Sequence, residues 1–186
     1  MQKQSVKERI IETASRLFYF EGYNQTGINQ IIEEAGVAKS SMYQSFRSKE
    51  EIAVEYLQRR HKMWMGNLSD FVSDKKSGND KIIGALGYIK DWLEEVEYRG
   101  CGFQNIVTDL PKGQNSIADQ VLLHKNELLN WLRQELKEEN YNNTELEILA
   151  KEIMVIMEGA IILAQIQKNS WPVNSAESTL RKLLAE

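Results

Sequence analysis

The segment 39–45 carries side chains that suit hydrogen bonding to the edges of nucleic-acid bases. In a helix, its polar residues would share one side, while Met42 and the following Phe46 would face the other. A Gln side chain can form two hydrogen bonds with adenine, and a Lys side chain can reach the acceptor atoms of guanine. The residues expected to face the major groove of DNA are Lys39, Ser40, Ser41, Tyr43, Gln44 and Ser45.

Thr26 and Lys49 stand at the predicted starts of two helices. Hydroxyl, ammonium and free backbone N–H groups at such positions suit phosphate oxygens, so both residues are candidates for contacts with the DNA backbone. The basic cluster 59–62 is instead expected to be a solvated face. Three basic residues near the N-terminus are further candidates for phosphate contact: Lys3, Lys7 and Arg9.

The patterns that carry enzymatic chemistry are missing from the sequence. It has no glycine-rich phosphate loop, no nucleophile elbow and no metal-ligand spacing. His61 and His124 lie on different predicted helices, with no acid or nucleophile beside them. The single cysteine excludes an internal disulfide. We therefore expect a protein that is not an enzyme and that has no cofactor or metal.

Helices must position these residues, because apolar side chains recur at helical spacing along nearly the whole chain. The apolar residues between 6 and 18 define one face of a first helix, and Gly22 suits the left-handed turn that closes it. Thr26 is expected to cap a second helix, and Ser48 with Glu51 has the spacing of a capping box. The sequence predicts an all-α fold of about nine helices and no strand, with a second capping box opening a helix at Thr144 and the last helix following Asn174.

Two short predicted helices joined by a turn at Gly36 form a helix-turn-helix pattern. Over about residues 5–57, the sequence resembles the DNA-binding domain of TetR-family repressors. The resemblance implies a three-helix DNA-binding domain at 1–48 and a helical ligand-binding and dimerisation domain at 49–186. It also implies that Thr26, Tyr43 and Lys49 contact the DNA backbone. The matching residues are Phe18, Gly22, Tyr23, Thr26, Ile31, Ala35, Gly36, Val37, Lys39, Tyr43, Phe46, Ser48, Lys49 and Glu50.

Composition fits this interpretation once the charge is divided along the chain. The 186 residues are 42% hydrophobic and 27% charged, an ordinary balance for a globular protein. The net charge of −4 separates into +2 for residues 1–63 (10 Lys/Arg, 8 Asp/Glu) and −6 for residues 64–186 (13 Lys/Arg, 19 Asp/Glu). An anionic partner would therefore dock on the N-terminal part. The longest apolar stretch, 153–166, is too short to span a membrane, so we expect a cytoplasmic protein.

The apolar stretch after about Thr144 predicts a helix that is buried on more than one side. One side can face its own core and another a second copy of the chain, giving a four-helix interface with the last helix. The alternative is a helix buried wholly within one chain. The residues predicted to form the dimer interface are Met157, Ala160, Ile161, Ala164 and Leu180.

Large apolar side chains in the C-terminal part could line a small-molecule pocket or simply fill a core. Polar residues within the apolar stretches could supply hydrogen bonds to a ligand, although Glu158 could equally join two helices. The residues predicted to bind the ligand are Trp64, Tyr88, Trp92, Phe103, Gln104, Trp131, Met154 and Glu158.

Cys101 lies between two glycines, beside Arg99 and ahead of a predicted helix. Backbone N–H groups and a cation there could lower the pKa of the thiol, which would suit a sensor of oxidants or electrophiles. The alternative is a buried, inert cysteine.

These observations predict a homodimer that binds a near-palindromic double-stranded DNA operator. Its two recognition helices would enter successive major grooves roughly 34 Å apart. The resemblance to TetR-family repressors implies that the function is repression, relieved by a small-molecule inducer. Two alternatives are a redox- or electrophile-sensing repressor acting through Cys101 and a DNA-binding dimer controlled by a protein partner. A cavity of several hundred cubic ångströms would favour the ligand sensor.

Overall fold

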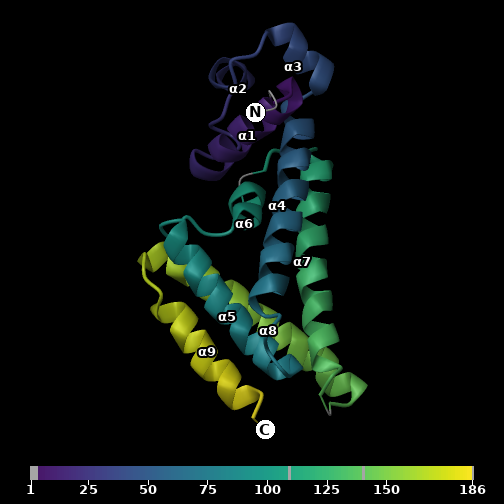
Figure 1. Ribbon diagram of the computed structural model, residues 1–186, viewed down its shortest axis with the longest axis vertical. Helices are drawn as coiled ribbons and strands as arrows, with labels where there is room; N and C mark the ends of the chain where they lie inside the picture. The colour runs from purple at the N-terminus through teal and green to yellow at the C-terminus, as the bar shows by residue number, and fades with distance from the viewer. Residues whose placement is uncertain (1–3, 109, 140, 186) are drawn as a thin grey trace. The chain divides into compact units, whose positions relative to one another are not determined.

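The computed structural model describes residues 4–108, 110–139 and 141–185, and this part of the chain contains nine helices and no strand (Figure 1). The predicted all-α fold is confirmed. The helices are α1 (Val6–Phe20), α2 (Ile28–Glu34), α3 (Lys39–Ser45), α4 (Lys49–Phe71), α5 (Gly78–Glu95), α6 (Gly102–Val107), α7 (Asn115–Leu136), α8 (Asn143–Gln167) and α9 (Trp171–Leu183).

The chain folds into two compact units. Unit 1 comprises the chain up to residue 62 together with 102–124, and unit 2 comprises 63–101 together with 125 onwards. Helices α4 and α7 each contribute residues to both units. The predicted functional boundary at residue 48 stays a prediction.

Unit 1 is built on α1, which packs against α2, α3 and α6. Ser5 caps α1 by accepting a hydrogen bond from the backbone N–H of Glu8, at 3.1 Å. Gly22 closes the helix at a φ of 104°, in the left-handed region, as its position in the sequence predicts. The buried face of α1 includes Ile10 and Leu17 and forms the centre of this unit.

Unit 2 is a packing of α5, α8 and α9, which lie side by side in Figure 1. Helix α8 buries Leu149, Ile153 and Met157 against its neighbours, and α9 buries Val173 and Leu180. The carboxylate of Glu147 at the start of α8 accepts two hydrogen bonds of 2.7 Å from Arg133 of α7. These contacts give unit 2 a core of its own.

Three helix starts differ from the positions that the sequence indicates. Gly27 rather than Thr26 is the N-cap of α2. Asn142, two residues before Thr144, caps α8 in a complete capping box with Glu145. Helix α9 begins at Trp171 rather than after Asn174, because Pro172 falls in the first turn, where a missing N–H costs nothing.

No helix within the described ranges is long and apolar enough to cross a membrane.

Candidate nucleic-acid interface

Helix α3 exposes a row of polar side chains and buries the residues between them. Met42 is fully buried and Phe46 nearly so, as the helical spacing predicts. Both anchor the helix to unit 1. The side chains left on the outside are Lys39, Ser40, Tyr43 and Gln44, with Ser41 half-buried beside them.

The turn before α3 is held from α1. Gly36 has a φ of 61°, a backbone conformation that favours glycine. Its carbonyl accepts a hydrogen bond of 3.1 Å from the guanidinium of Arg9. An ion pair between Arg16 and Glu34 fixes α2 to the same helix. Two residues of α1 therefore contact α2 and the turn that follows it.

The phosphate contact expected at Thr26 stays a prediction, and the structure shows another role for its side chain. The side chain is fully buried, and its hydroxyl donates a hydrogen bond of 2.8 Å to the carbonyl of Gly22. Thr26 therefore closes the turn after α1 instead of meeting solvent. The backbone N–H groups at the start of α2, next to Gly27, remain the groups there that suit a phosphate.

The ammonium of Lys49 likewise makes its contacts within the chain. Its ammonium donates to the carbonyls of Tyr23 and Thr26 at 3.0 and 3.1 Å, and it lies 4.2 Å from the centre of the Tyr23 ring. Burial lowers the pKa of the Lys49 ammonium. The role visible in the structure is to fasten the start of α4 to the loop before α2.

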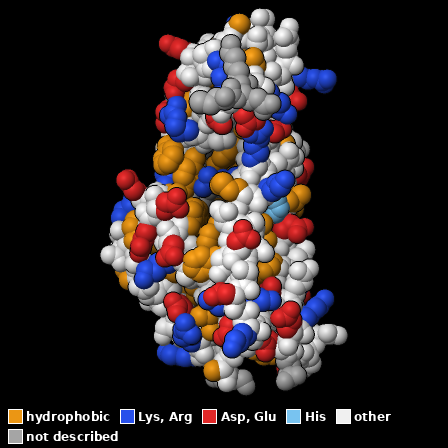
Figure 2. All heavy atoms as spheres, in the orientation of Figure 1, with side chains coloured by type: hydrophobic (Ala, Val, Ile, Leu, Met, Phe, Trp, Pro, Cys, Tyr) orange, Lys and Arg blue, Asp and Glu red, His pale blue; other side chains and the backbone are white. Residues whose placement is uncertain are grey.

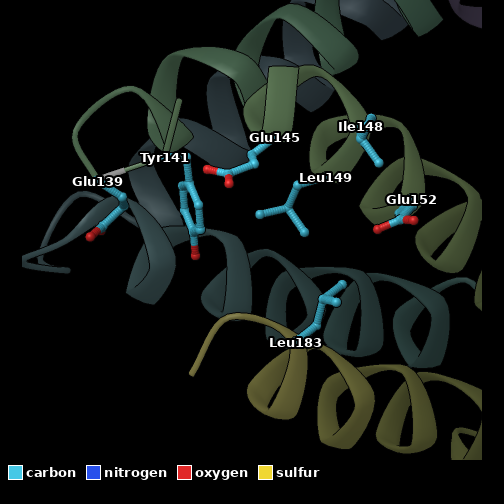
Figure 3. A pocket seen from close by; sticks show the side chains of 7 residues that line it. All are labelled: Glu139, Tyr141, Glu145, Ile148, Leu149, Glu152 and Leu183. Atoms are coloured by element: carbon cyan, nitrogen blue, oxygen red, sulfur yellow. The ribbon is translucent and has the colours of Figure 1, made fainter. Parts of the chain in front are cut away.

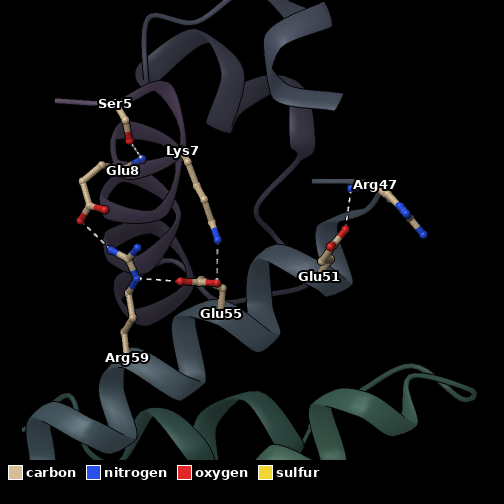
Figure 4. Close-up of polar contacts among 7 residues, drawn as sticks. All are labelled: Ser5, Lys7, Glu8, Arg47, Glu51, Glu55 and Arg59. Carbon is tan, nitrogen blue, oxygen red and sulfur yellow. Dashed lines mark hydrogen bonds and ion pairs between the residues drawn. The ribbon is translucent and has the colours of Figure 1, made fainter. Parts of the chain in front are cut away.

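An ion-pair network joins α1 to α4, as Figure 4 shows. Arg59 contacts Glu8 at 2.6 Å and Glu55 at 3.0 Å, and Lys7 contacts Glu55 at 3.1 Å. The hydrogen bond from Arg59 lowers the pKa of Glu8 below its ordinary value. Lys7 and Arg9 therefore bind groups within unit 1 rather than a phosphate. Lys3 lies outside the described residues.

Three residues of the predicted solvated cluster 59–62 are half-buried and contact other groups of unit 1, while Lys62 is exposed. Arg60 lies over the ring of Tyr19 at 3.8 Å. The Nδ1 atoms of His61 and His124 are 3.1 Å apart, within hydrogen-bond distance, and the ring of Phe103 stacks on that of His124 at 3.8 Å. The structure brings together two histidines that the sequence separates by a long interval, because α4 and α7 meet within unit 1.

Arg47 is a functional candidate that the sequence-based list omits. Its side chain is exposed directly after α3, and its backbone N–H donates a hydrogen bond of 2.6 Å to the carboxylate of Glu51 (Figure 4). Glu51 therefore reaches Arg47 rather than Ser48, while Ser48 still caps α4 through the N–H of Glu51. The signal in the sequence is a basic residue between the predicted recognition helix and a helix cap.

Charged side chains of both signs are interspersed over the face shown in Figure 2. That face carries no large patch of a single charge sign. Recognition of an anionic partner would depend on the placement of single side chains.

The predicted ligand residues do not gather as one group. Trp64, Tyr88 and Trp92 form an aromatic cluster in unit 2, with ring centroids 5.3 Å (Trp64–Tyr88) and 6.4 Å (Trp64–Trp92) apart. Trp131 and Met154 are half-buried in the same unit, and Glu158 forms an ion pair with Lys125. Phe103 and Gln104 belong to unit 1. The ring of Phe103 stacks there on that of His124, so Phe103 is a core residue.

A pocket of about 610 Å³ lies in unit 2 beside the start of α8 (Figure 3). Carboxylates, one aromatic ring and aliphatic side chains line it, and none of these was predicted from the sequence. The carboxylate of Glu139 accepts a hydrogen bond from the backbone of Asn79, and that of Glu145 accepts one from Asn142. The lining residues are Glu139, Tyr141, Glu145, Ile148, Leu149, Glu152 and Leu183.

The residues predicted for the dimer interface lie in the core of unit 2. All five, Met157, Ala160, Ile161, Ala164 and Leu180, are buried within their own chain. Helix α8 is apolar on several sides, and its inner side faces α5 and α9. Its exposed apolar residues are Ile148, Val155, Ile162, Leu163 and Ile166.

Comparisons with known proteins agree with this architecture. A family model described as bacterial regulatory proteins of the tetR family matches residues 10–56. The HTH-type transcriptional regulator LmrA of Bacillus subtilis is 25% identical over 182 residues, 96% of each chain. The uncharacterized HTH-type regulator YxaF of the same organism is 52% identical over 50 residues, 26% of each chain. The proteins matched by sequence are thus transcriptional regulators.

Solved structures share the whole fold. A TetR transcriptional regulator from Legionella pneumophila has a TM-score of 0.82 at 24% identity, over 98% of this chain and 99% of that one. A TetR transcriptional regulator from Chloroflexus aurantiacus has the same TM-score and identity, over 97% and 94%.

Proposed function

We propose that this chain, a TetR-family transcriptional regulator, is a repressor that reads a near-palindromic operator as a homodimer and is released by a small molecule. The observation that carries the proposal is the two-sided character of α3. Its buried residues fix it in unit 1, while its exposed side chains can hydrogen-bond to bases. Such a regulator acts in the cytoplasm, where bacterial DNA lies.

The outer side of α3 contacts the bases in this proposal. Gln44 can bond an adenine in the major groove through two hydrogen bonds, and Lys39 can reach guanine. Tyr43, 46% exposed, can donate its hydroxyl to a phosphate. Serine at position 40 is small enough to let the helix approach the bases closely.

The phosphate contacts are assigned to other groups near α3. The exposed guanidinium of Arg47 is one, and the backbone N–H groups at the start of α2 are another. Thr26 and Lys49 serve this interface indirectly, because they fix the loop and the helix start between which α2 and α3 lie.

The proposed dimer surface is the exposed apolar side of α8. Val155 is 72% exposed, Ile166 66% and Ile148 53%. Their spacing of seven and eleven residues keeps them on one side of the helix, and a row of such side chains costs free energy in water. A second copy offers the same apolar row, so a two-fold contact of α8 and α9 with their counterparts covers both.

The pocket beside the start of α8 supports a small-molecule effector. Its volume of about 610 Å³ lies within the range of ligand sites, and its lining combines aliphatic with charged groups. An effector releases DNA only to the extent that it binds better to a state whose recognition helices are misplaced. The pocket favours this mechanism over control by a protein partner.

The test is substitution on the outer side of α3. We expect Tyr43→Ala to weaken binding to a selected operator while the circular dichroism spectrum and the melting temperature stay unchanged. Unchanged affinity would show that α3 does not contact DNA through this side. Leu122→Ala, at another exposed position in unit 1, is the matched control.

A further inference from the structure

The pocket beside the start of α8 has carboxylates at both ends of an apolar stretch. Glu145 and Glu152 line it, and their spacing of seven residues keeps the two side chains on one side of the helix. Ile148 and Leu149 lie between them, about one turn from each. Figure 3 shows the same order, with Glu145 at one end, Glu152 at the other and Leu149 between them. The pocket therefore has two acidic ends and an aliphatic middle.

Side chains from outside α8 extend this division. The ring of Tyr141 lies beside the carboxylate of Glu145, and Leu183 of α9 lies across the pocket from Leu149 (Figure 3). An aromatic face attracts a cation, and aliphatic side chains gain from contact with a methylene chain. The Glu145 end therefore suits a positive charge, and the middle suits a hydrocarbon.

The carboxylates of the pocket have no basic partner among the described residues. Glu139 accepts a hydrogen bond of 3.0 Å from the backbone N–H of Asn79, and Glu145 accepts one of 3.0 Å from that of Asn142. Neither these two nor Glu152 forms an ion pair with a described lysine or arginine, and no such residue lines the pocket. Other glutamates of unit 2 do form such pairs: Glu135, Glu147, Glu158 and Glu177. The negative charge of the pocket is thus left for a ligand to balance.

We propose that this pocket binds a linear aliphatic polyamine, with an ammonium group at each end of a methylene chain, a ligand class that rests on the role of the pocket as the effector site proposed above. One ammonium binds between Glu145 and Tyr141, and the other binds Glu152. A helix rises about 1.5 Å per residue, so the two glutamates are about 10 Å apart along α8, which an extended chain of about eight methylene groups spans. The chain lies against Leu149 and Leu183.

Binding at two ends gives a selectivity that an acidic surface alone does not give. A single exposed ion pair contributes little, because water and salt screen it. Once one ammonium is bound, the methylene chain holds the second near its carboxylate at a high effective concentration. A diamine of matching length should therefore bind more tightly than a shorter diamine or a monoamine of the same length.

Isothermal titration calorimetry of the full chain, without DNA, compares three probes at near-physiological salt. They are a linear eight-carbon diamine, the four-carbon diamine and octylamine. We expect the eight-carbon diamine to bind about 10-fold more tightly than either of the others. Equal affinities would indicate a general acidic surface, and tighter binding of octylamine would indicate an apolar groove. Either result, or no binding of any probe, would overturn the proposal.

Glutamine variants test the two ends separately. Glu152→Gln removes one charge at almost constant size, so the affinity for the eight-carbon diamine should fall by about 10-fold while that for octylamine changes by about twofold or less. Glu145→Gln should do the same, and it keeps the capping box of α8, since glutamine also serves there. Glu127→Gln, at an exposed glutamate of α7 outside the pocket, is the matched control. A diamine affinity that survives both pocket variants would place the binding elsewhere and overturn the proposal.

Ile148 also belongs to the proposed dimer surface, so the pocket opens at the edge of that surface. The dimer should persist in sedimentation equilibrium at a saturating concentration of the eight-carbon diamine. Its dissociation would assign the pocket to the contact between copies and overturn the proposal.

Operator binding is measured separately, so the failure of each proposal can be told apart. A diamine that binds as expected but leaves the operator complex intact would support the ligand class and remove the pocket from the control of DNA binding. A chain that binds no operator would remove the repressor, while the calorimetric result would still support the polyamine site.

Discussion

Helices α3 and α8 both leave one side uncovered, and the two sides differ in chemistry. Helix α3 exposes Lys39, Ser40 and Gln44, which are well solvated in the free protein and still able to exchange water for bases. Helix α8 exposes Val155 and Ile166, which gain only by leaving water. The contrast supports the two proposed partners, a hydrated polyanion for one helix and an apolar protein surface for the other.

The strongest test places charge on the exposed side of α8. The double variant Val155→Glu and Ile166→Glu would bury unpaired carboxylates in the proposed interface. We expect the dimer dissociation constant to rise by about 100-fold or more, equivalent to about 3 kcal/mol, in sedimentation equilibrium. Asn126→Glu, at an exposed polar position of α7, should change nothing. A dimer that survives the double variant would assign this side of α8 to another role.

The buried side of α3 gives the next largest effect. Met42→Ala removes a fully buried side chain and leaves a cavity, so the free energy of unfolding should fall by about 2–5 kcal/mol. Urea denaturation measures the change. Ser40→Ala, on the outer side of the same helix, should stay within about 0.5 kcal/mol. Equal losses for the two variants would contradict the assignment of sides.

Gln44 tests what the outer side of α3 reads. Gln44→Ala should cost about 1–3 kcal/mol of discrimination at one base position of each half-site. Binding to operators substituted one base at a time, followed by fluorescence anisotropy, measures it. A loss that is the same for every operator would make Gln44 a backbone contact instead.

Arg47 is expected to behave in the opposite way to Gln44. Arg47→Ala should weaken binding almost equally for all sequences and lower the dependence of affinity on salt by about one ion for each protomer. A titration across salt concentrations gives this slope. An unchanged slope would exclude a phosphate contact.

The smallest effect is expected at an exposed ion pair of unit 2 at low pH. Hydrogen bonds from Arg133, and then the contact with Lys151, lower the pKa of Glu147 to about 2. A depressed pKa stabilises the folded chain above the unfolded value of 4.5, and this contribution is lost as pH falls from 4.5 toward 2. Thermal unfolding of Glu147→Gln should therefore depend less on pH over this interval. An identical pH profile would show that this exposed pair adds nothing.

Features set by neighbouring residues could be predicted from the sequence. The left-handed turn at Gly22 and the buried positions of Met42 and Phe46 follow from local spacing, and the structure has each of them. The nine helices follow in the same way from apolar periodicity.

Features set by packing could not be predicted. The buried hydroxyl of Thr26 and the internal ammonium of Lys49 depend on how the loop after α1 folds back. The sides of α8 could not be told apart, because the helix is apolar almost all round and only α5 and α9 decide which side is inner. The residues that line the pocket come from three separate segments, so no local sequence pattern predicts the pocket.

The most direct test of the central claim is enrichment of bound duplexes from a random DNA pool by the purified chain at near-physiological salt. The account predicts a winning site with two inverted half-sites whose centres lie one helical turn apart, roughly 34 Å. A winning site without inverted symmetry, or no enrichment at all, would contradict the dimeric reader proposed for α3 and α8.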